Sequence, residues 1–155
     1  MIRVLSRLAI LVLALAFRPS VLDAQVATVN SLTFGTIVAG TGRSVGAASA
    51  SSAQWRIGSV LGFGAGFDLT LPATLDRVGG GATLPITFCS TCAIYRLNNS
   101  NPSGGVVFNP HNTISFGLLP LSTIYVWLGA SVSPPVSQPS GSYVGTVVLT
   151  YTGVL

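Results

Sequence analysis

The sequence predicts an all-β protein, an antiparallel sandwich of about seven to nine short strands. Three observations favour this fold. Apolar and polar residues alternate with period 2 in several segments, stretches rich in Gly, Pro, Asn and Ser separate these segments, and the chain contains neither Lys nor Glu. Beyond the N-terminal region, no window shows the 3.6-residue apolar period of an amphipathic helix.

The clearest alternation is in the first half of the chain, where Phe67, Leu69 and Leu71 are separated by Asp68 and Thr70. Pro72 ends this run, as expected at a strand end. By the same criteria the sequence predicts strands at residues 32–38, 55–63, 67–71, 84–88, 93–97, 106–108, 114–118, 124–128 and 143–151. Residues 40–52 are small and polar and predict a weak strand or a loop. The predicted core contains Phe67, Leu69, Leu71, Leu84, Ile86, Phe88, Val147 and Leu149, with the last strand at its centre.

The N-terminal 24 residues have the pattern of a cleaved signal peptide. Arg3 and Arg7 precede an apolar run at residues 8–17, and the small residue Ala24 suits the cleavage site. A membrane-spanning helix needs about 20 apolar residues, so we expect no membrane span after cleavage. The sequence therefore predicts a secreted protein that passes through the periplasm to the cell surface or medium, with residues 25–155 as one domain.

Charged residues are scarce, at 6% of the chain. Residues 25–155 carry four arginines, at positions 43, 56, 77 and 96, against Asp68 and Asp76. Four scattered arginines do not form the basic stripe that follows a phosphate backbone. We expect no nucleic-acid partner.

Cys89 and Cys92 are the chain's two cysteines. In an exported protein they predict a disulfide, which requires a turn at residues 89–92 because extended residues three apart are too distant. A redox pair is an alternative, but the following residues 93–97 indicate a strand and not a helix. Zinc would need two more ligands, and His111 is the one histidine.

Catalytic candidates are few. His111 could act as the base of a catalytic triad, with Asp68 or Asp76 orienting it. Asp68 and Asp76 are also the one carboxylate pair within residues 25–155 for glycoside hydrolysis. Neither set has a supporting motif, so we expect no enzyme activity and no cofactor.

Two late strands carry aromatic or β-branched residues on both faces. Tyr125 and Trp127 share one face of strand 124–128 and are a candidate ligand platform, although burial under a loop is an equally simple use. Tyr143, Val147, Leu149 and Tyr151 share one face of strand 143–151, and a strand of this kind must be covered or used for assembly.

Residues 32–37 (LTFGTI), 67–72 (FDLTLP) and 141–151 (GSYVGTVVLTY) together resemble a bacterial secreted domain family of unknown function. That family is similar to the spore coat protein U and fimbrial, or chaperone-usher pilus, subunits. The resemblance implies an immunoglobulin-like sandwich in a structural subunit of an extracellular fibre, pilus or surface layer. Such a subunit lacks one strand, accepts a strand from a periplasmic chaperone, and later accepts one from the next subunit.

In this family the donor strand lies ahead of the motif at residues 32–35. Here the segment available after cleavage is residues 25–31, in which Val26, Ala27, Thr28 and Val29 form a short, weakly apolar candidate assembly strand. Because this segment is short, the protein is alternatively a tip subunit, a subunit that only accepts a strand, or a domain that is complete by itself. Self-association or other fibre subunits are the expected partners, and a secreted adhesin-like module that binds carbohydrate or an apolar ligand on its aromatic faces is the alternative function.

Overall fold

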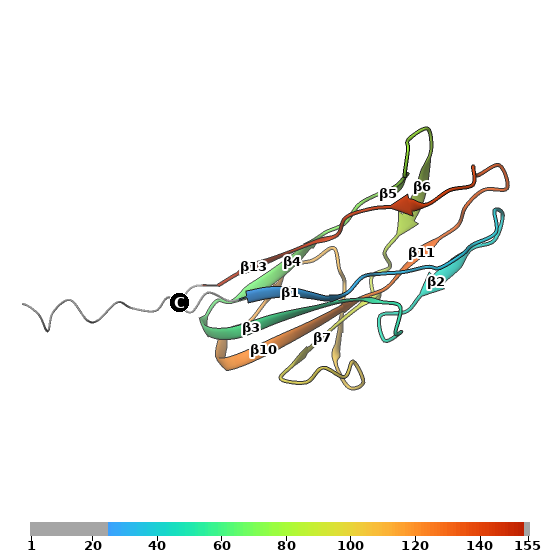
Figure 1. Cartoon of the computed structure of the whole chain (residues 1–155). Helices are drawn as coiled ribbons and strands as arrows, with labels where there is room; N and C mark the ends of the chain where they lie inside the picture. Colours follow the sequence, from blue (N-terminus) through green and yellow to red (C-terminus); the bar gives the residue numbers. More distant parts are fainter. Residues whose placement is uncertain (1–24, 154–155) are drawn as a thin grey trace, which may run out of the picture.

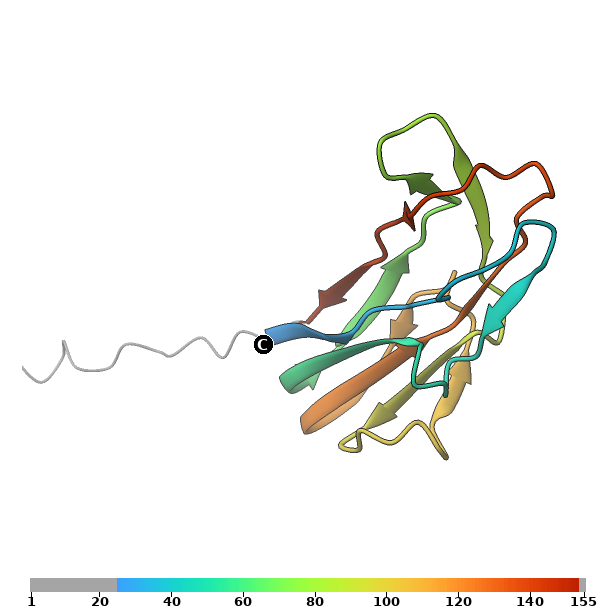
Figure 2. The same ribbon diagram turned by 45° about the vertical axis from the view of Figure 1, so that its right-hand side comes forward.

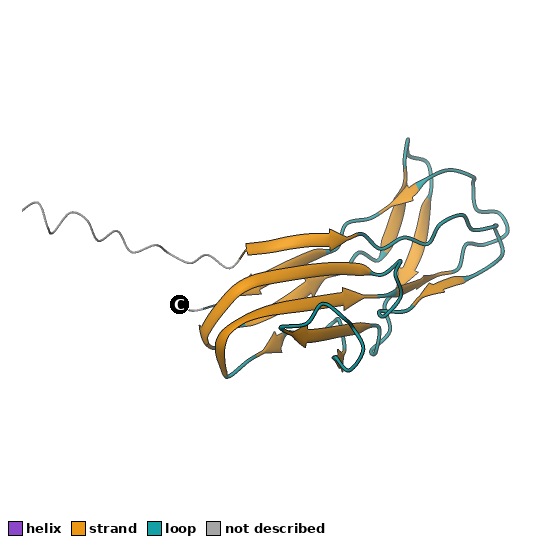
Figure 3. Ribbon diagram, turned by 60° about the horizontal axis from the view of Figure 1, so that its bottom comes forward, coloured by secondary structure: helices purple, strands orange, loops and turns teal. Residues whose placement is uncertain are grey.

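The computed structural model describes residues 25–153, and within them it contains thirteen strands and no helix. Figure 3 shows strands joined by loops throughout this part of the chain. The expected signal peptide, residues 1–24, lies outside the described residues. The prediction of an all-β antiparallel sandwich is confirmed. No helix of the described residues is long and apolar enough to cross a membrane.

The first layer is one five-stranded antiparallel sheet (Figure 1). Its order is β1 (Gln25–Asn30), β3 (Ala53–Phe63), β10 (Leu118–Leu128), β7 (Ala93–Leu97) and β8 (Val106–Phe108). In β10 the inward residues Ile124, Val126 and Leu128 have no solvent exposure. Their alternation explains why this segment forms a central strand.

The second layer consists of two smaller sheets. One has the order β12 (Tyr143–Val144), β5 (Thr74–Arg77), β6 (Thr83–Thr87), β11 (Ala130–Val132) and β2 (Arg43–Val45). The other has the order β13 (Val148–Thr152), β4 (Gly66–Thr70) and β9 (Ile114–Ser115). Figure 1 shows β4 continuing toward β5 and β12 toward β13, so that the two sheets lie end to end.

The hydrophobic core lies between the two layers. Phe67 has no solvent exposure, and its ring is 6.1 Å from that of Tyr95, 5.6 Å from that of Phe108 and 6.2 Å from that of Phe116, measured between centroids. The first two pairs meet edge to face, which is a favourable arrangement of aromatic quadrupoles. This cluster joins β4 of the second layer to β7 and β8 of the first.

The chain changes layer at two tight points. The Cys89–Cys92 disulfide, with Cα atoms 5.0 Å apart, closes the turn between β6 and β7, which confirms the predicted pairing. Gly129 connects β10 to β11, and a Cβ atom there would lie 2.2 Å from the carbonyl oxygen of Val45. Glycine is therefore required at this crossing because backbone atoms occupy the space.

Eight of the nine predicted strands overlap observed strands, and the first does not. Residues 31–38 are paired to no strand, although Leu32, Phe34 and Ile37 still pack against the core. The chain also forms three strands that the pattern did not predict as such, namely β1, β5 and β11. In β5, Leu75 is the one large apolar residue, so the period-2 signal there is weak.

The predicted long strand at residues 143–151 is interrupted. It forms β12 and β13, and each is an edge strand, so the prediction of a central position is wrong. A Cβ at Gly145, between the two strands, would lie 2.7 Å from Cδ2 of Leu75. Among the predicted core residues, Phe67, Leu69, Leu84, Ile86 and Phe88 are buried, whereas Leu71, Val147 and Leu149 are half-buried.

Candidate functional site

One side of the sandwich is open between its two layers. β1 is the end strand of the first sheet, while β12 and β13 are the end strands of the two smaller sheets. Figures 1 and 2 show β1 (blue) and β13 (red) running along the same side of the molecule. Each of these strands pairs with one neighbour, on its inner side. Their outer edges therefore present backbone groups that another strand can pair with.

A groove of about 920 Å³ lies between the edges of β1 and β12. Its N-terminal rim is the segment that starts in β1 and extends to Ala39, and its C-terminal rim is residues 138–147. The floor is made by apolar side chains of both layers: Ala53, Trp55, Pro72, Leu75, Leu84, Ile86 and Val132. The groove therefore has an apolar floor between two rims.

Both rims carry apolar side chains that are only half-buried. Leu32, Phe34 and Ile37 pack against the core from the N-terminal rim, and Tyr143 and Val147 pack against it from the C-terminal rim. A strand laid in the groove would cover the exposed parts of these side chains. Covering apolar area is favourable by about 25 cal/mol per Å².

The rims are held in place by hydrogen bonds. Thr33 N–H donates to the Ser51 carbonyl oxygen at 2.9 Å, and the Asn30 side-chain amide donates to the carbonyl oxygens of Ala50 and Ser52 at 2.9 and 2.8 Å. On the other rim, the Tyr143 hydroxyl donates to the Pro139 carbonyl oxygen at 2.7 Å. That bond lies within the C-terminal rim, which is tied to the second layer by Val78 N–H donating to the Ser142 carbonyl oxygen at 2.8 Å. Both rims are therefore held by contacts to residues that do not line the groove.

The two rims meet at one end of the groove. Gly40 N–H donates to the Pro134 carbonyl oxygen at 3.0 Å, and Val136 approaches Gly40 so closely that a Cβ there would lie 2.7 Å from Val136 Cγ1. At the other end, β1 and β13 are not paired with each other. The groove is therefore bridged at one end and unbridged at the other.

The predicted assembly residues fall on the two sides of this opening. Val26, Ala27 and Thr28 pair with Ile57, Arg56 and Trp55 in β3, and Val29 lies at the irregularity that follows. They form an edge strand of this chain's own sheet in this structure, and their use as a donor strand stays a prediction. Tyr143 and Val147 line the groove, and Leu149 and Tyr151 continue along β13.

The candidate ligand platform is only partly accessible. Tyr125 and Trp127 stack with ring centroids 6.1 Å apart and an interplanar angle of 22°. Tyr125 is half-buried, but Trp127 is 3% exposed. Trp127 therefore cannot offer a ring face to a ligand in this structure. Its burial agrees with the alternative that the sequence analysis gave for this residue.

The catalytic candidates lie on separate elements. Asp68 is opposite Thr150 in the β4–β13 ladder, and Asp76 is opposite Thr83 in the β5–β6 ladder. His111 follows β8, and its Nε2 is 3.1 Å from the Phe88 carbonyl oxygen. Within residues 25–153, no three His, Cys, Asp or Glu side chains gather as metal ligands would.

Sequence reasoning missed the N-terminal rim as part of a site. Leu32 and Phe34 alternate as in a strand, and this pattern alone does not reveal that the segment has no pairing partner. A strand-like segment next to an edge strand is the signal that a groove is present. This signal can be recognised only when the order of the strands in the sheets is known.

The fold and the groove define a β-sandwich with one open side. Comparison with family models, with curated proteins and with solved structures gives no match to this chain.

Proposed function

We propose that this protein is an exported structural subunit of an extracellular fibre, pilus or surface layer, and that a β-strand from another subunit fills its groove. The observation that carries the proposal is the apolar groove between two unpaired edges, lined by residues of β1, residues 31–39 and residues 138–147. The signal-like N-terminal sequence and the disulfide support an exported protein.

Strand addition would use both the free strand edges beside the groove and its apolar floor. Backbone groups on the free edges of β1 and β12 can form a new ladder, and alternate side chains of the added strand can pack on Trp55, Leu84 and Ile86. Each large apolar side chain that becomes buried in this way contributes about 1.5–3 kcal/mol. Several such side chains are needed, because association itself costs about 4–15 kcal/mol.

The expected partners are further copies of this chain or other fibre subunits, and a periplasmic chaperone would occupy the groove during export. An exposed apolar groove is an aggregation hazard, so temporary coverage is a physical need of such a subunit. In this proposal the groove is the acceptor side of the contact.

Assembly can be tested with the full chain produced by export. Light scattering after size exclusion and negative-stain microscopy should show oligomers or filaments for the wild type. Val147→Arg places a charge in the groove and should give a monomer, since an unpaired buried charge is strongly unfavourable. Val148→Arg is the matched control, because Val148 is 49% exposed and does not line the groove.

Thermal unfolding of each variant separates lost assembly from lost folding. If Val147→Arg does not fold, Thr36→Arg on the opposite rim replaces it, since Thr36 is exposed and lines the groove. A wild-type protein that stays monomeric at every concentration, or equal loss of assembly in Val148→Arg and the groove variants, would refute the proposal.

A further inference from the structure

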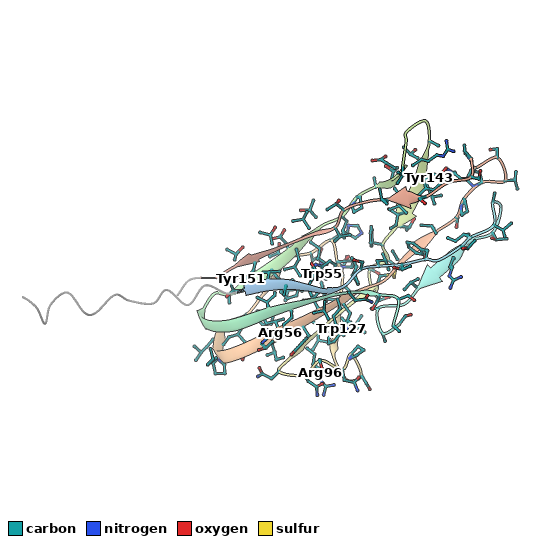
Figure 4. The ribbon with its side chains drawn as sticks, viewed as in Figure 1. Trp55, Arg56, Arg96, Trp127, Tyr143 and Tyr151 are labelled. Atoms are coloured by element: carbon teal, nitrogen blue, oxygen red, sulfur yellow. A yellow bond between two sulfur atoms is a disulfide. The ribbon has the colours of Figure 1, made fainter. Side chains whose placement is uncertain are left out.

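The outer face of the first sheet carries a row of three side chains, Arg56, Tyr125 and Arg96. Tyr125 in β10 is directly opposite Arg56 in β3 and directly opposite Arg96 in β7. Residues directly opposite each other point to the same face of a sheet, so the tyrosine stands between the two arginines. Figure 4 shows Arg56 and Arg96 on the side of the sheet away from Trp55, which lines the groove.

The two arginines share this face with no carboxylate of the described residues. Of the chain's three acidic residues, Asp68 is in β4 and Asp76 is in β5, both in the second layer, and Asp23 lies outside the described residues. Neighbouring strands are about 4.8 Å apart, which places the two strands that carry the arginines about 9.6 Å apart. The row therefore forms a small positive patch with an aromatic ring at its centre.

Arg96 is held by the loop that follows β7. Its Nη1 donates to the Asn101 carbonyl oxygen at 3.1 Å and also to the Ser103 carbonyl oxygen. The loop is itself anchored, because Asn98 N–H donates to the Thr123 carbonyl oxygen at 2.7 Å and Thr123 N–H donates to Asn98 Oδ1 at 2.8 Å. The guanidinium has five N–H donors, so donors remain for a ligand after these two contacts.

Arg56 lies flat over a glycine of its own strand. Three atoms of its guanidinium, Cζ, Nη1 and Nη2, are each 3.6 Å from the position that a Cβ of Gly58 would occupy. Equal distances from one point indicate that the planar group faces the backbone there. Arg56 is nevertheless an exposed residue, and a planar fork in this position can bind a carboxylate with two parallel hydrogen bonds.

The ring of Tyr125 is supported by its neighbour on the same face of β10. It stacks on Trp127 at a centroid distance of 6.1 Å, and Trp127 is buried. A half-buried tyrosine fixed in this way offers an apolar ring face and a hydroxyl group. The loop beside it is rich in Asn and Ser, whose amide and hydroxyl groups suit a polyhydroxylated ligand.

We propose that Arg56, Tyr125 and Arg96 form a binding site for a carboxylated polysaccharide. The two guanidinium groups bind carboxylates of uronic acid residues, and the Tyr125 ring packs against the sugar ring between them. This site lies on the face opposite the groove, so it is independent of strand addition.

Isothermal titration of the full exported protein with an oligogalacturonate, and with its methyl ester, tests this site. We expect the acid to bind and the ester to bind at least about tenfold more weakly, since a hydrogen bond to a charged group contributes about 1.5–3 kcal/mol. Arg56→Gln and Tyr125→Ala should each weaken binding about tenfold or more. Arg56→Lys should fall between wild type and Arg56→Gln, because lysine keeps the charge but not the planar fork.

Arg43→Gln is the matched control, because Arg43 is an exposed arginine in β2 of the second layer. Its affinity should equal that of the wild type. No binding of the oligogalacturonate, equal binding of its ester, or equal loss in Arg43→Gln and Arg56→Gln would overturn the proposal. Tighter binding of a sulfated glycan than of the oligogalacturonate would overturn the assignment of carboxylate as the ligand.

Discussion

The two tryptophans of this chain stand on opposite faces of one sheet and differ in what covers them. Trp127 is 3% exposed on the outer face, where it stacks on Tyr125 and lies between Gln54 and Ile94 of the neighbouring strands. Trp55 is 6% exposed, but it lines the groove between the two layers. The two tryptophans are thus about equally buried. Trp127 is covered on the outer face of its sheet, whereas Trp55 borders the groove.

The comparison extends to two glycines, Gly129 at the crossing from β10 to β11 and Gly145 between β12 and β13. A Cβ at Gly129 would meet the Val45 carbonyl oxygen at 2.2 Å and the Ala47 nitrogen at 2.7 Å, which are both backbone atoms. A Cβ at Gly145 on the open side would meet Leu75 Cδ2 at 2.7 Å, the end of a flexible side chain. A side chain at position 129 therefore requires backbone atoms to move, whereas one at position 145 mainly requires the Leu75 side chain to move, with the Thr74 carbonyl oxygen 3.3 Å from the Cβ position.

The largest effect should come from Gly129→Ala. We expect it to lower the free energy of unfolding by about 3 kcal/mol, because the backbone of residues 45–47 must move. Gly145→Ala should cost about 1 kcal/mol, since Leu75 can change rotamer. Urea denaturation of both variants measures the difference, with Gly46→Ala as control because a Cβ there meets nothing within 4 Å. Equal losses at positions 129 and 145 would show that the contacts at Gly145 give way no more readily than those at Gly129.

A smaller, spectroscopic effect should distinguish the two tryptophans directly. Trp127→Phe leaves Trp55 as the only tryptophan, and Trp55→Phe leaves Trp127. Adding Thr36→Arg changes the polarity of the groove, so it should shift the emission maximum of Trp55 and leave that of Trp127 unchanged. A shift of both emission maxima would indicate that the groove and the outer face are coupled.

The smallest effect concerns pH. Partial burial raises the pKa of the Tyr151 hydroxyl above its ordinary value of 10.0. A group with a raised pKa in the folded state contributes stability below its ordinary pKa, and this contribution is lost as the pH rises through the raised value. Unfolding midpoints should therefore fall above about pH 10, and Tyr151→Phe should reduce that fall. An unchanged alkaline profile in Tyr151→Phe would assign the pH dependence to other groups.

The sequence was most informative where burial is complete on one face. Phe67, Leu69, Leu84 and Ile86 alternate with polar residues and are buried, as predicted. The pairing of Cys89 and Cys92 was predictable for a different reason, because the N-terminal pattern led us to expect export, where two cysteines so close in the sequence pair in a turn.

The sequence was least informative at the edges of the sheets. Residues 31–38 have a strand pattern but no partner, and residues 143–151 have a continuous pattern but a break near Gly145. Both outcomes depend on contacts with distant residues, such as Leu75 at Gly145. Period-2 alternation reports which side of a segment is buried, and it does not report how many neighbours the segment has.

The functional residues also divide into those that the sequence could predict and those that it could not. Tyr143 and Val147, which the sequence predicted as assembly residues, line the groove, whereas Leu149 and Tyr151 continue along β13 outside its lining. The row of Arg56, Tyr125 and Arg96 could not be predicted from the sequence, because its members lie on three strands whose register is set by long-range pairing. Charge patterns across a sheet are invisible until that register is known.

The hydrogen bond between Gly40 and Pro134 makes the two ends of the groove different, because it bridges one end only. A strand that fills the groove by sliding along it has one entrance, next to the outer ends of β1 and β13, and a stop at the bridge. Successive subunits joined through such grooves would all point the same way. The resulting filament would have two chemically different ends, so growth and termination would be separate events at opposite ends.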